Sequence, residues 1–331
     1  MEKNQMYTLC YILTDDKKLR YYNQLLISLA SLRLHTFAGK VCVLMDDVTA
    51  GILRANNCDA LSDFGVESIV VNIQGNYTQE EKSRYLKTEL REHLSGDVLY
   101  IDTDTIIVKD LPAEVSYHDV AMVQDQNWKQ IDGDTKTTVP ASNRCVRHRL
   151  LLAENCEYSL DISSRYFNSG VIWVKDTDFV HAFFKEWHSE WEKCRARGVI
   201  KDQPSLNDIN VRNGHVIADL DGCWNVQVAC QMALRYLDSS IIIHYFNYEN
   251  VYRLSRLDVQ KQGYQSKAVQ EIISDPLNAF CPYTVMVTDE ASEEVFYCRA
   301  FAALKHMFVN HRQLYRGINF LLSIPDRIKK R

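Results

Sequence analysis

The sequence predicts an α/β protein, in which β-strands alternate with helices along the chain. Three observations point to this fold class. The 331 residues suffice for one large domain with an extension, or for two domains. Apolar residues make up 46% of the chain and charged residues 24%, an ordinary composition for a globular protein with a large core. Short β-branched runs alternate with longer segments of helical periodicity, and no repeat or low-complexity segment interrupts them.

Residues 1–96 contain three predicted strands and two predicted helices. The strands are apolar, β-branched runs at 7–14, 40–47 and 66–72. After the first strand, apolar side chains recur at the spacing of one helical face: Tyr22, Leu25, Leu26, Leu29 and Leu32. A second helix is expected over 78–94, because Thr78 and Glu81 form the Thr-x-x-Glu pattern of a capping box. This helix leads to a strand that begins at residue 97.

Four further elements are expected between residues 166 and 247. In 166–175, Asn-Ser-Gly precedes a strand, and a small turn there lets backbone N–H groups approach a ligand. The segment 201–208 predicts the start of a helix with Pro204 in its first turn. A strand over 239–247 carries His244, and a lone histidine at such a place is more often structural than functional. One stripe of side chains predicts a core-facing helix: Val180, Phe183, Phe184, Trp187, Trp191 and Cys194.

Charge and composition argue against several classes of protein. The formal net charge of −5 disfavours a general nucleic-acid binder, because tracking phosphates requires a basic surface. No apolar stretch approaches the roughly 18 to 20 residues that a membrane span requires. The N-terminal residues predict a strand rather than a signal peptide. The ten cysteines form no Cys-x-x-Cys pair, so we expect reduced thiols in a cytoplasmic protein.

Two carboxylates, Asp102 and Asp104, follow the apolar strand that begins at residue 97. In an extended chain, residues two apart face the same way, so both carboxylates can converge on one point. Buried charge is costly unless it is paired or bound to a metal. Two hard oxygen donors suit Mg²⁺ or Mn²⁺, and such an ion suits a diphosphate. The acidic pair alone is a weak signal, but the apolar segments on both sides favour a rigid metal site over a solvated turn.

The C-terminal tail, residues 305–331, holds seven Lys or Arg residues against one acid, Asp326. On a helical wheel, five apolar side chains share one face: Met307, Leu314, Ile318, Leu321 and Leu322. Three cationic side chains lie opposite: Lys305, Arg312 and Arg316. One interpretation is a packed helix with a solvated basic end. The other is an interfacial helix attracted to anionic lipid.

Seven segments of the sequence, in this order, resemble the family 8 retaining glycosyltransferases, which include glycogenin and bacterial lipopolysaccharide galactosyl- and glucosyltransferases. The segments are ILTDD, SRYLKTEL, LYIDTDTIIVKDL, FNSGVIWV, DQPSLN, WNVQ and IIIHY, and they span roughly residues 7–250. The resemblance implies a GT-A fold, a twisted and mostly parallel sheet between helices that binds a nucleotide sugar, usually UDP-linked. It places the catalytic domain in 1–260 and a mostly helical extension in 261–331.

The resemblance also implies a role for individual residues. The metal, Mn²⁺ or Mg²⁺, would be held by three side chains: Asp102, Asp104 and His244. Uracil and ribose would lie beside three neighbouring residues: Thr14, Asp15 and Asp16. The donor sugar would contact three others: Asn168, Ser169 and Asp202. Gln203 would lie close to the anomeric carbon. Lys87 would lie near the sugar-diphosphate. Independently of the resemblance, Arg84 lies one helical turn from Lys87 and is expected to reach a phosphate, and Thr103, between the two carboxylates, completes the expected donor-binding set.

Two positions depart from the family pattern. Family members commonly have a lysine, often followed by Pro-Trp, a few residues after the metal histidine, where it grips the diphosphate. Here Asn250 lies near that place, and Arg253 or Arg256 is the candidate substitute. Lys87 stands where the family often has an arginine, so it keeps the charge but lacks the bidentate fork. Both departures predict an altered grip on the donor or an altered choice of donor.

The leading hypothesis is a metal-dependent retaining glycosyltransferase of cell-surface polysaccharide or lipopolysaccharide synthesis. It would move a hexose, galactose or glucose, from a UDP-sugar to a glycan or lipid-linked glycan. Front-face substitution is favoured, because Gln203 is a poor nucleophile and Asp202 is expected on sugar hydroxyls. No nucleic-acid partner is expected. The protein would be cytoplasmic and, if its tail is interfacial, peripheral at the inner face of the membrane.

Two alternatives remain open at this point. A nucleotidyltransferase also uses carboxylates and a divalent metal, but it predicts an early Gly-rich phosphate loop, and ILTDDKKLRYY has no glycine. A sugar-nucleotide-binding module without turnover is disfavoured by the intact set of Asp102, Asp104 and His244. Turnover of a UDP-sugar would separate the module from the enzyme.

Overall fold

The computed structural model of the chain describes residues 7–127, 129–130, 137–138, 144–158, 160, 165–228, 230, 233–246, 259, 263–276 and 299–322. Contacts within the chain divide it into two compact units, Met1–Phe280 and Cys281–Arg331. The predicted division into a catalytic domain over 1–260 and an extension over 261–331 stays a prediction.

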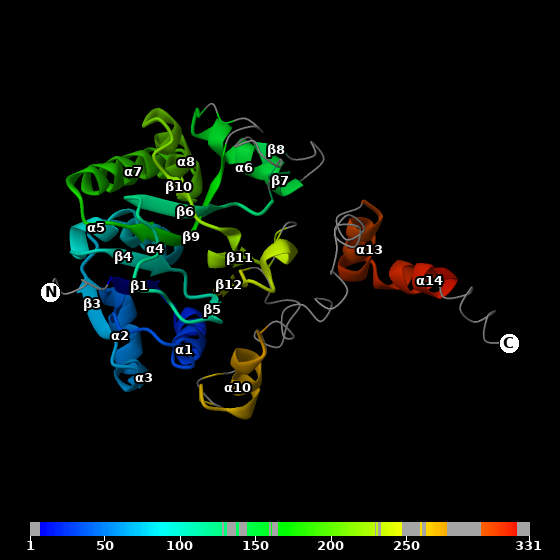
Figure 1. The fold of residues 1–331 in the computed structure, drawn as a ribbon, viewed down its shortest axis with the longest axis horizontal. Helices are drawn as coiled ribbons and strands as arrows, with labels where there is room; N and C mark the ends of the chain where they lie inside the picture. Colours follow the sequence, from blue (N-terminus) through cyan, green and yellow to red (C-terminus); the bar gives the residue numbers. More distant parts are fainter. Residues whose placement is uncertain are drawn as a thin grey trace. The chain divides into compact units, whose positions relative to one another are not determined.

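Among the described residues, seven strands form the central sheet of the first unit (Figure 1). Their order across the sheet is β10, β6, β9, β4, β1, β2, β3. In chain order they are β1 (Thr8–Leu13), β2 (Lys40–Asp46), β3 (Glu67–Val71), β4 (Val98–Ile101), β6 (Val120–Gln124), β9 (Phe167–Val174) and β10 (Ala218–Asp219). Strand β9 runs antiparallel to its neighbours β4 and β6, and the other pairs in this sheet are parallel. The mostly parallel sheet of the prediction is confirmed.

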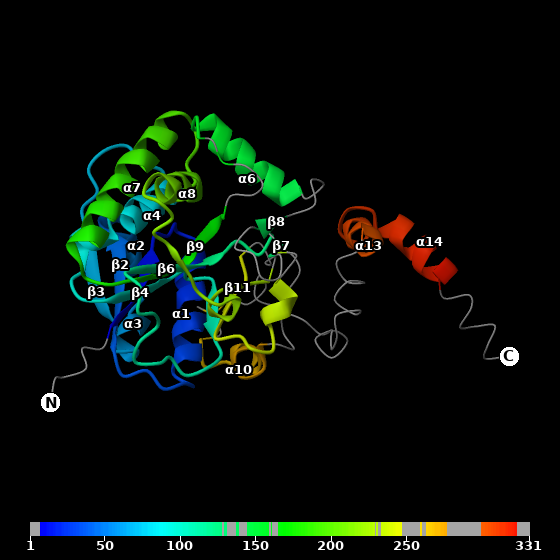
Figure 2. The same cartoon turned by 45° about the horizontal axis from the view of Figure 1, so that its top comes forward.

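The sheet carries a hydrophobic core on each face, because successive side chains of a strand point to opposite sides. In β1, Leu9 and Tyr11 belong to one core, while Cys10 and Ile12 belong to the other. The first core includes residues of α1 (Arg20–Leu32), α2 (Asp47–Ala55), α3 (Ala60–Asp63) and α10 (Lys267–Ser274). The second includes residues of α4 (Gln79–Thr88), α5 (Leu90–His93), α7 (Asp178–Ala196) and α8 (Gln203–Arg212). Figure 2 shows the resulting three layers.

A second, three-stranded sheet positions the functional residues. It consists of β11 (Val226–Gln227), β12 (Ile242–His244) and β5 (Thr105–Ile107). The chain leaves the central sheet at the end of β4 and enters this small sheet at β5. Because β12 runs antiparallel to β5, His244 pairs with Thr105 directly after the two carboxylates. The remaining elements among the described residues of the first unit are β7 (Lys129–Gln130), β8 (Thr137–Thr138), α6 (Arg144–Asn155) and the 3₁₀ helices Gly222–Trp224 and Ala233–Tyr236.

Three local predictions are corrected by the structure. Asn-Ser-Gly does not form a turn before a strand; it lies inside β9, between the pair of Phe167 with β6 and the pairs that β4 and β6 make with the rest of the strand. The helix predicted over 78–94 is interrupted at Glu89, which separates α4 from α5. The expectation of reduced thiols is wrong for Cys156 and Cys194, which form a disulfide between the end of α6 and α7.

The second unit contains α13 (Arg299–Asn310) and α14 (Arg312–Leu322). The tail pattern is therefore helical as far as residue 322, with a break at His311 between the two helices. In α14, Leu314 is 56% and Leu321 is 62% exposed. None of the described helices is both long enough and apolar enough to cross a membrane. The basic residues after 322 lie outside the described part of the chain.

Candidate active site

Asp102 and Asp104 lie in a bend where the chain passes from β4 to β5. The bend is held from both sides. The backbone N–H of Asp102 donates to the carbonyl of Gly170 on β9 at 2.8 Å, and the N–H of Tyr245 donates to the carbonyl of Asp104 at 3.0 Å. Because the chain bends here instead of continuing as an extended strand, Thr103 also lines the cavity described below.

The side chains of Asp102, Asp104 and His244 form one cluster, in which the three potential ligand atoms lie within 4.8 Å of one another. His244 Nε2 lies 3.1 Å from Asp104 Oδ1 and 3.7 Å from Asp102 Oδ2. Burial favours the neutral acid at Asp104, but the charge of His244 and its hydrogen bond outweigh burial and lower the pKa of Asp104. Burial likewise opposes the charged form of His244, and Asp104 reverses this and raises the pKa of His244. Two carboxylates and one imidazole are a suitable donor set for a divalent cation.

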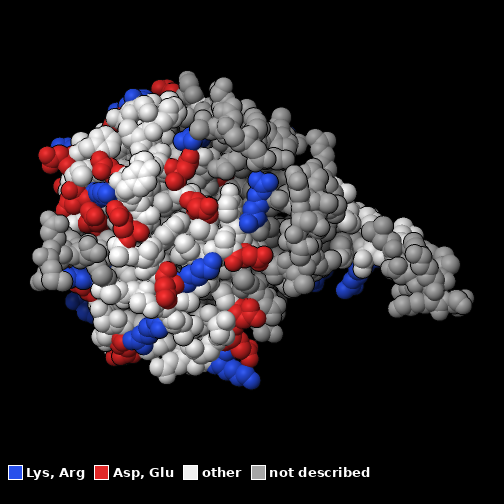
Figure 3. Space-filling view, viewed as in Figure 1, with Lys and Arg blue, Asp and Glu red and all other residues white. Residues whose placement is uncertain are grey.

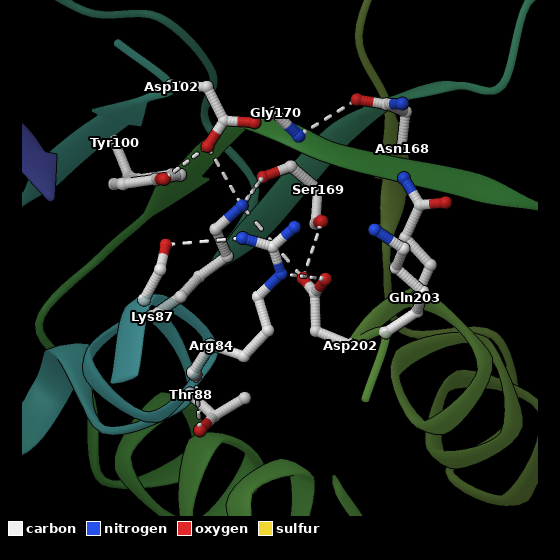
Figure 4. Close-up of polar contacts among 12 residues, drawn as sticks. Arg84, Lys87, Thr88, Tyr100, Asp102, Asn168, Ser169, Gly170, Asp202 and Gln203 are labelled. Atoms are coloured by element: carbon white, nitrogen blue, oxygen red, sulfur yellow. Dashed lines mark hydrogen bonds and ion pairs between the residues drawn. The ribbon is translucent and has the colours of Figure 1, made fainter. Parts of the chain in front are cut away.

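Lys87 joins this cluster to the rest of the site (Figure 4). Its Nζ lies 2.9 Å from Asp102 Oδ1 and 3.9 Å from Asp202 Oδ2, and it donates to the carbonyl of Ser169 at 3.1 Å. The ammonium group also lies 4.8 Å from the centre of the Tyr100 ring. The Tyr100 hydroxyl donates to Asp102 Oδ1, and burial together with the Asp102 charge raises the pKa of Tyr100 well above its usual value. Lys87 therefore balances the charge of two carboxylates, the partly exposed Asp102 and the buried Asp202.

Both oxygens of Asp202 are engaged by neighbouring side chains (Figure 4). Oδ1 lies 3.5 Å from Nε of Arg84, and Oδ2 accepts a hydrogen bond from the Ser169 hydroxyl at 2.6 Å. Burial favours the neutral acid, but Lys87 and Arg84 outweigh burial and lower the pKa of Asp202. Asp202 thus stays a carboxylate in a buried place, directly before Gln203, the first residue of α8.

A cavity of about 560 Å³ unites these groups. It is lined by twelve of the predicted site residues: Thr14, Asp16, Arg84, Lys87, Asp102, Thr103, Asp104, Asn168, Ser169, Asp202, Gln203 and His244. Asp15 is the exception. Its carboxylate accepts the backbone N–H groups of Asp16 at 2.8 Å and Tyr22 at 2.6 Å, so it holds the start of α1 and does not line the cavity.

Several residues of the site, among them Tyr100 and Asn225, were not singled out from the sequence. Tyr100 lies two positions before Asp102, and strand alternation is a signal that would have placed both on one side. Asn225 Oδ1 accepts a hydrogen bond from Nδ1 of the His244 ring at 3.0 Å, and no spacing in the sequence points to this contact. Arg253 and Arg256, the candidate substitutes for the missing lysine, lie outside the described residues.

Comparisons with known proteins agree with this architecture. Residues 92–268 match the nucleotide-diphospho-sugar transferase family. Among solved structures, galactosyltransferase LgtC in complex with donor and acceptor sugar analogues is 15% identical, with 81% of this chain and 95% of that chain covered and a TM-score of 0.51. Mouse xyloside xylosyltransferase 1 is 16% identical, with 73% and 98% covered and a TM-score of 0.45. No match was found among the curated proteins.

At such identities the likeness to LgtC concerns the fold, and it confirms the predicted GT-A architecture. The family match covers more than half of the chain and includes the bend at Asp102 and Asp104, the Asp202–Gln203 pair and His244. On this evidence the chain is a glycosyltransferase that belongs to the nucleotide-diphospho-sugar transferase family.

Proposed function

We propose that the protein is a metal-dependent retaining glycosyltransferase that moves galactose or glucose from a UDP-sugar to a glycan or glycolipid acceptor. The proposal rests on one observation: three groups of residues line the same cavity. They are the Asp102–Asp104–His244 cluster, the cations Arg84 and Lys87, and the Asp202–Gln203 pair. Family membership favours glycosyl transfer over nucleotidyl transfer and over binding without turnover.

The donor set of the cluster fits Mn²⁺ or Mg²⁺, held by Asp102, Asp104 and His244. Such an ion, when bound, neutralises charge that grows on the leaving nucleoside diphosphate. Lys87 and Arg84 add fixed positive charge beside the same cavity, which favours a diphosphate there.

Asp202 is poorly suited to act as a nucleophile, because a carboxylate engaged by Arg84, Lys87 and Ser169 loses those contacts when it forms a covalent bond. We therefore favour front-face substitution. The bond between the anomeric carbon and the diphosphate oxygen breaks, the acceptor hydroxyl oxygen bonds to the same face of that carbon, and its proton passes to the leaving diphosphate. Asp202 and Gln203 orient the donor sugar as it acquires oxocarbenium character. A covalent glycosyl–enzyme trapped on Asp202 would refute this route.

The first test is calorimetric binding of UDP to the purified protein with and without Mn²⁺. We expect Mn²⁺-dependent binding, which Asp104→Ala weakens by at least about 100-fold because a metal ligand is lost. Asp208→Ala is the matched control, because Asp208 lies on α8, pairs with Arg212 and does not line the cavity. An affinity for UDP that is the same with and without Mn²⁺, and the same in Asp104→Ala as in the wild type, would contradict the metal site.

The donor is tested with a panel of UDP-sugars, in which turnover of UDP-galactose or UDP-glucose is the expected result. UDP-galactose is the first choice, because the similar structure LgtC is a galactosyltransferase. The stereochemistry at the anomeric carbon of the product then decides between retention and inversion. Inversion would contradict the proposal.

The proposal for the acceptor also assigns the protein a place at the membrane surface. We propose that the protein is cytoplasmic and serves lipopolysaccharide or other cell-surface polysaccharide synthesis, with residues 305–331 touching anionic lipid at the inner face of the membrane. The exposed Leu314 and Leu321 and the basic composition of this segment support the proposal. A lipid-linked acceptor would then be presented to the enzyme at the membrane surface.

A further inference from the structure

The segment 14–16, which follows β1, forms one side of the cavity, where Thr14 and Asp16 line it. Strands β1 and β4 are parallel neighbours, so their carboxyl ends meet at one edge of the central sheet, where β4 leads to the metal cluster. Asp202 is bonded to Ser169 of β9, the neighbour of β4 on the other side. A donor with its diphosphate at the metal and its sugar at Asp202 therefore has its nucleoside beside segment 14–16.

The backbone ladder between β1 and β2 ends before this segment. Its last pair is Leu13 with Met45, and β2 continues for one more residue, Asp46. Beyond the ladder, the N–H of Asp15 donates to a side chain, the hydroxyl of Thr49 in α2, at 2.9 Å. The position of the segment therefore depends on a side chain of a different element.

Thr49 belongs to a series of hydrogen bonds that has a fixed direction. Its oxygen accepts from the N–H of Asp15, which can only donate. The proton of its own hydroxyl is donated to Oδ1 of Asp46, and Oδ2 of Asp46 accepts from Nζ of Lys82 on α4 at 2.7 Å. The carboxylate of Asp46 is thus engaged from both sides, and the Thr49 oxygen faces the backbone of the segment.

The use of Asp46 departs from the usual pattern of a helix start. Asp46 is the N-cap residue of α2, a position from which an aspartate commonly accepts a backbone N–H of the first turn. Here its side chain makes no capping bond and is engaged by Thr49 and Lys82 instead. A residue that gives up a local stabilising role is expected where function requires another contact.

Burial keeps water from replacing these contacts. Asp46 and Thr49 are each 1% exposed, and Asp15 is 2% exposed. A buried N–H that loses its partner is costly, so the segment keeps the shape in which Asp15 reaches Thr49. Neither Thr49 nor Asp46 lines the cavity, so an effect of either residue on a ligand must pass through segment 14–16.

From this geometry we propose that Thr49 is a positioning residue, which holds segment 14–16 in the shape that receives the nucleoside of the donor. It acts through its hydroxyl group, placed between Asp46 and the N–H of Asp15. The inference rests on the proposed function, because the nucleoside is that of the proposed UDP-sugar.

Two probes separate the nucleoside from the diphosphate. UDP carries both groups, whereas inorganic pyrophosphate has no nucleoside, and calorimetry with Mn²⁺ measures the affinity of the full chain for each. Thr49→Val removes the hydroxyl at nearly constant volume. We expect it to bind UDP about tenfold more weakly, because the competent shape of the segment falls to about a tenth of the population. Its affinity for pyrophosphate should stay within about twofold of the wild type, because the metal cluster is unchanged.

Thr49→Ser is the conservative variant, since it keeps the hydroxyl and loses only the methyl group. We expect it to bind UDP as the wild type does. Should Thr49→Val fail to fold, Thr49→Ser still tests the proposal, because weak UDP binding by this variant would show that the hydroxyl does not hold the segment.

Amide hydrogen exchange of the ligand-free protein, followed by NMR at single residues, is the second readout. In Thr49→Val the amide of Asp15 should exchange at least about tenfold faster, because its hydrogen-bond acceptor is lost. The amide of Tyr11, inside the ladder of β1 and β2, should keep its rate. Equal acceleration at both residues would indicate general destabilisation and would contradict a local role.

Asn210→Leu is the matched control. Asn210 is fully buried and accepts the backbone N–H of Ile217 at 2.9 Å, but it does not line the cavity. Its loss should destabilise the fold without changing UDP affinity. If pyrophosphate binds too weakly to be measured, the comparison of UDP binding by Thr49→Val, Thr49→Ser and this control decides alone.

The outcomes of the experiment are distinct. A wild type that binds neither UDP nor pyrophosphate refutes the proposed function, and the exchange of the Asp15 amide still decides whether Thr49 holds the segment. Equal effects of Thr49→Val on UDP and pyrophosphate, or no effect on either, refute the positioning role. An unchanged exchange rate of the Asp15 amide refutes it as well.

Discussion

At the scale of single residues, Gly170 is a position of the site that has no room for a side chain. A Cβ built on Gly170 would lie 2.3 Å from Cε1 and 2.6 Å from Nδ1 of His244. His244 packs against this part of β9 because the strand has no side chain there. We predict that Gly170→Ala displaces the His244 ring, lowers Mn²⁺ affinity by at least about tenfold and destabilises the fold. Calorimetry with Mn²⁺ and UDP, together with urea unfolding, measures both effects.

Gly51→Ala is the control for this prediction. Gly51 lies inside α2, and a Cβ there meets no atom within 4 Å. Because alanine favours a helix interior over glycine by about 0.8–1 kcal/mol, this variant should be as stable as the wild type or more stable, with unchanged Mn²⁺ binding. Gly170→Ala with wild-type metal affinity would show that His244 adapts to the added methyl group.

The raised pKa of Asp15 predicts that the free energy of unfolding of the protein depends on pH. The side chain of Asp15 is 2% exposed, and burial outweighs its hydrogen bonds and raises its pKa to about 6. The folded state therefore binds the proton more tightly than the unfolded chain, whose aspartates titrate near pH 4. The contribution of Asp15 to stability is complete below about pH 4 and is lost as pH rises through about 6.

The comparison of wild type with Asp15→Asn isolates this group, because asparagine does not titrate. The free energy of unfolding of the wild type, relative to that of Asp15→Asn, should fall by about 2 kcal/mol between pH 4 and pH 7. Urea unfolding at several pH values measures the difference. Two parallel curves would mean that Asp15 keeps an ordinary pKa in the folded protein.

At the scale of elements, the capping box of α4 is a local device with a measurable effect. The Thr78 hydroxyl accepts the N–H of Glu81, and the Glu81 carboxylate accepts the N–H of Thr78 at 2.7 Å. Thr78→Ala removes the first bond and should lower the free energy of unfolding by about 1 kcal/mol, whereas Thr78→Ser keeps a hydroxyl and should stay close to the wild type. Equal destabilisation by both variants in urea unfolding would locate the effect in the lost methyl group.

Elements whose signal lies within a few residues were predictable from the sequence. The helix at Thr78 and the stripe of α7 are examples, because a cap and a 3.6-residue period depend on neighbours in the chain. The position of Asn-Ser-Gly was not, because these residues belong to β9 through pairs on either side of them, Gln124 with Phe167 on β6 and Ile101 with Val171 on β4. The disulfide of Cys156 with Cys194 likewise depends on how α6 and α7 are brought together.

The same distinction applies to the site. The spacing of Asp102 and Asp104 predicted their convergence, and the order of the family motifs predicted which segments share one cavity. Asp15 and Asp16 are adjacent in the sequence, yet Asp16 lines the cavity and Asp15 holds the start of α1. Asn225 Oδ1 lies 3.0 Å from Nδ1 of His244, nineteen residues away, and this contact depends on the pairing of β11 with β12 in the small sheet.

At the scale of the whole molecule, charges of both signs are mixed on the face of the first unit that Figure 3 shows. On the face seen in Figure 3, lysine and arginine side chains lie among aspartates and glutamates. The basic tail at 305–331 is different, with seven cationic residues and one acid. An attraction to anionic lipid would therefore come from this segment more than from the visible face of the catalytic unit.

We predict that the tail gives the protein its affinity for anionic membranes. Deletion of 305–331 should reduce sedimentation with anionic liposomes and leave UDP binding unchanged, because the cavity belongs to the first unit. A sharper variant is the double substitution of Leu314→Glu and Leu321→Glu, which removes two exposed apolar side chains of α14. Burial of apolar area contributes about 25 cal/mol per Å², so this variant should bind liposomes much more weakly.

Gln313→Glu with Asn319→Glu is the matched control, since it adds the same two negative charges to exposed polar positions of α14. If the helix lies in the interface, the leucine pair must weaken binding more than this control, because only the leucines lose apolar contact with the lipid. If both pairs weaken binding equally, the tail acts through charge alone. Liposome binding that survives the deletion of 305–331 would refute the membrane role of the tail altogether.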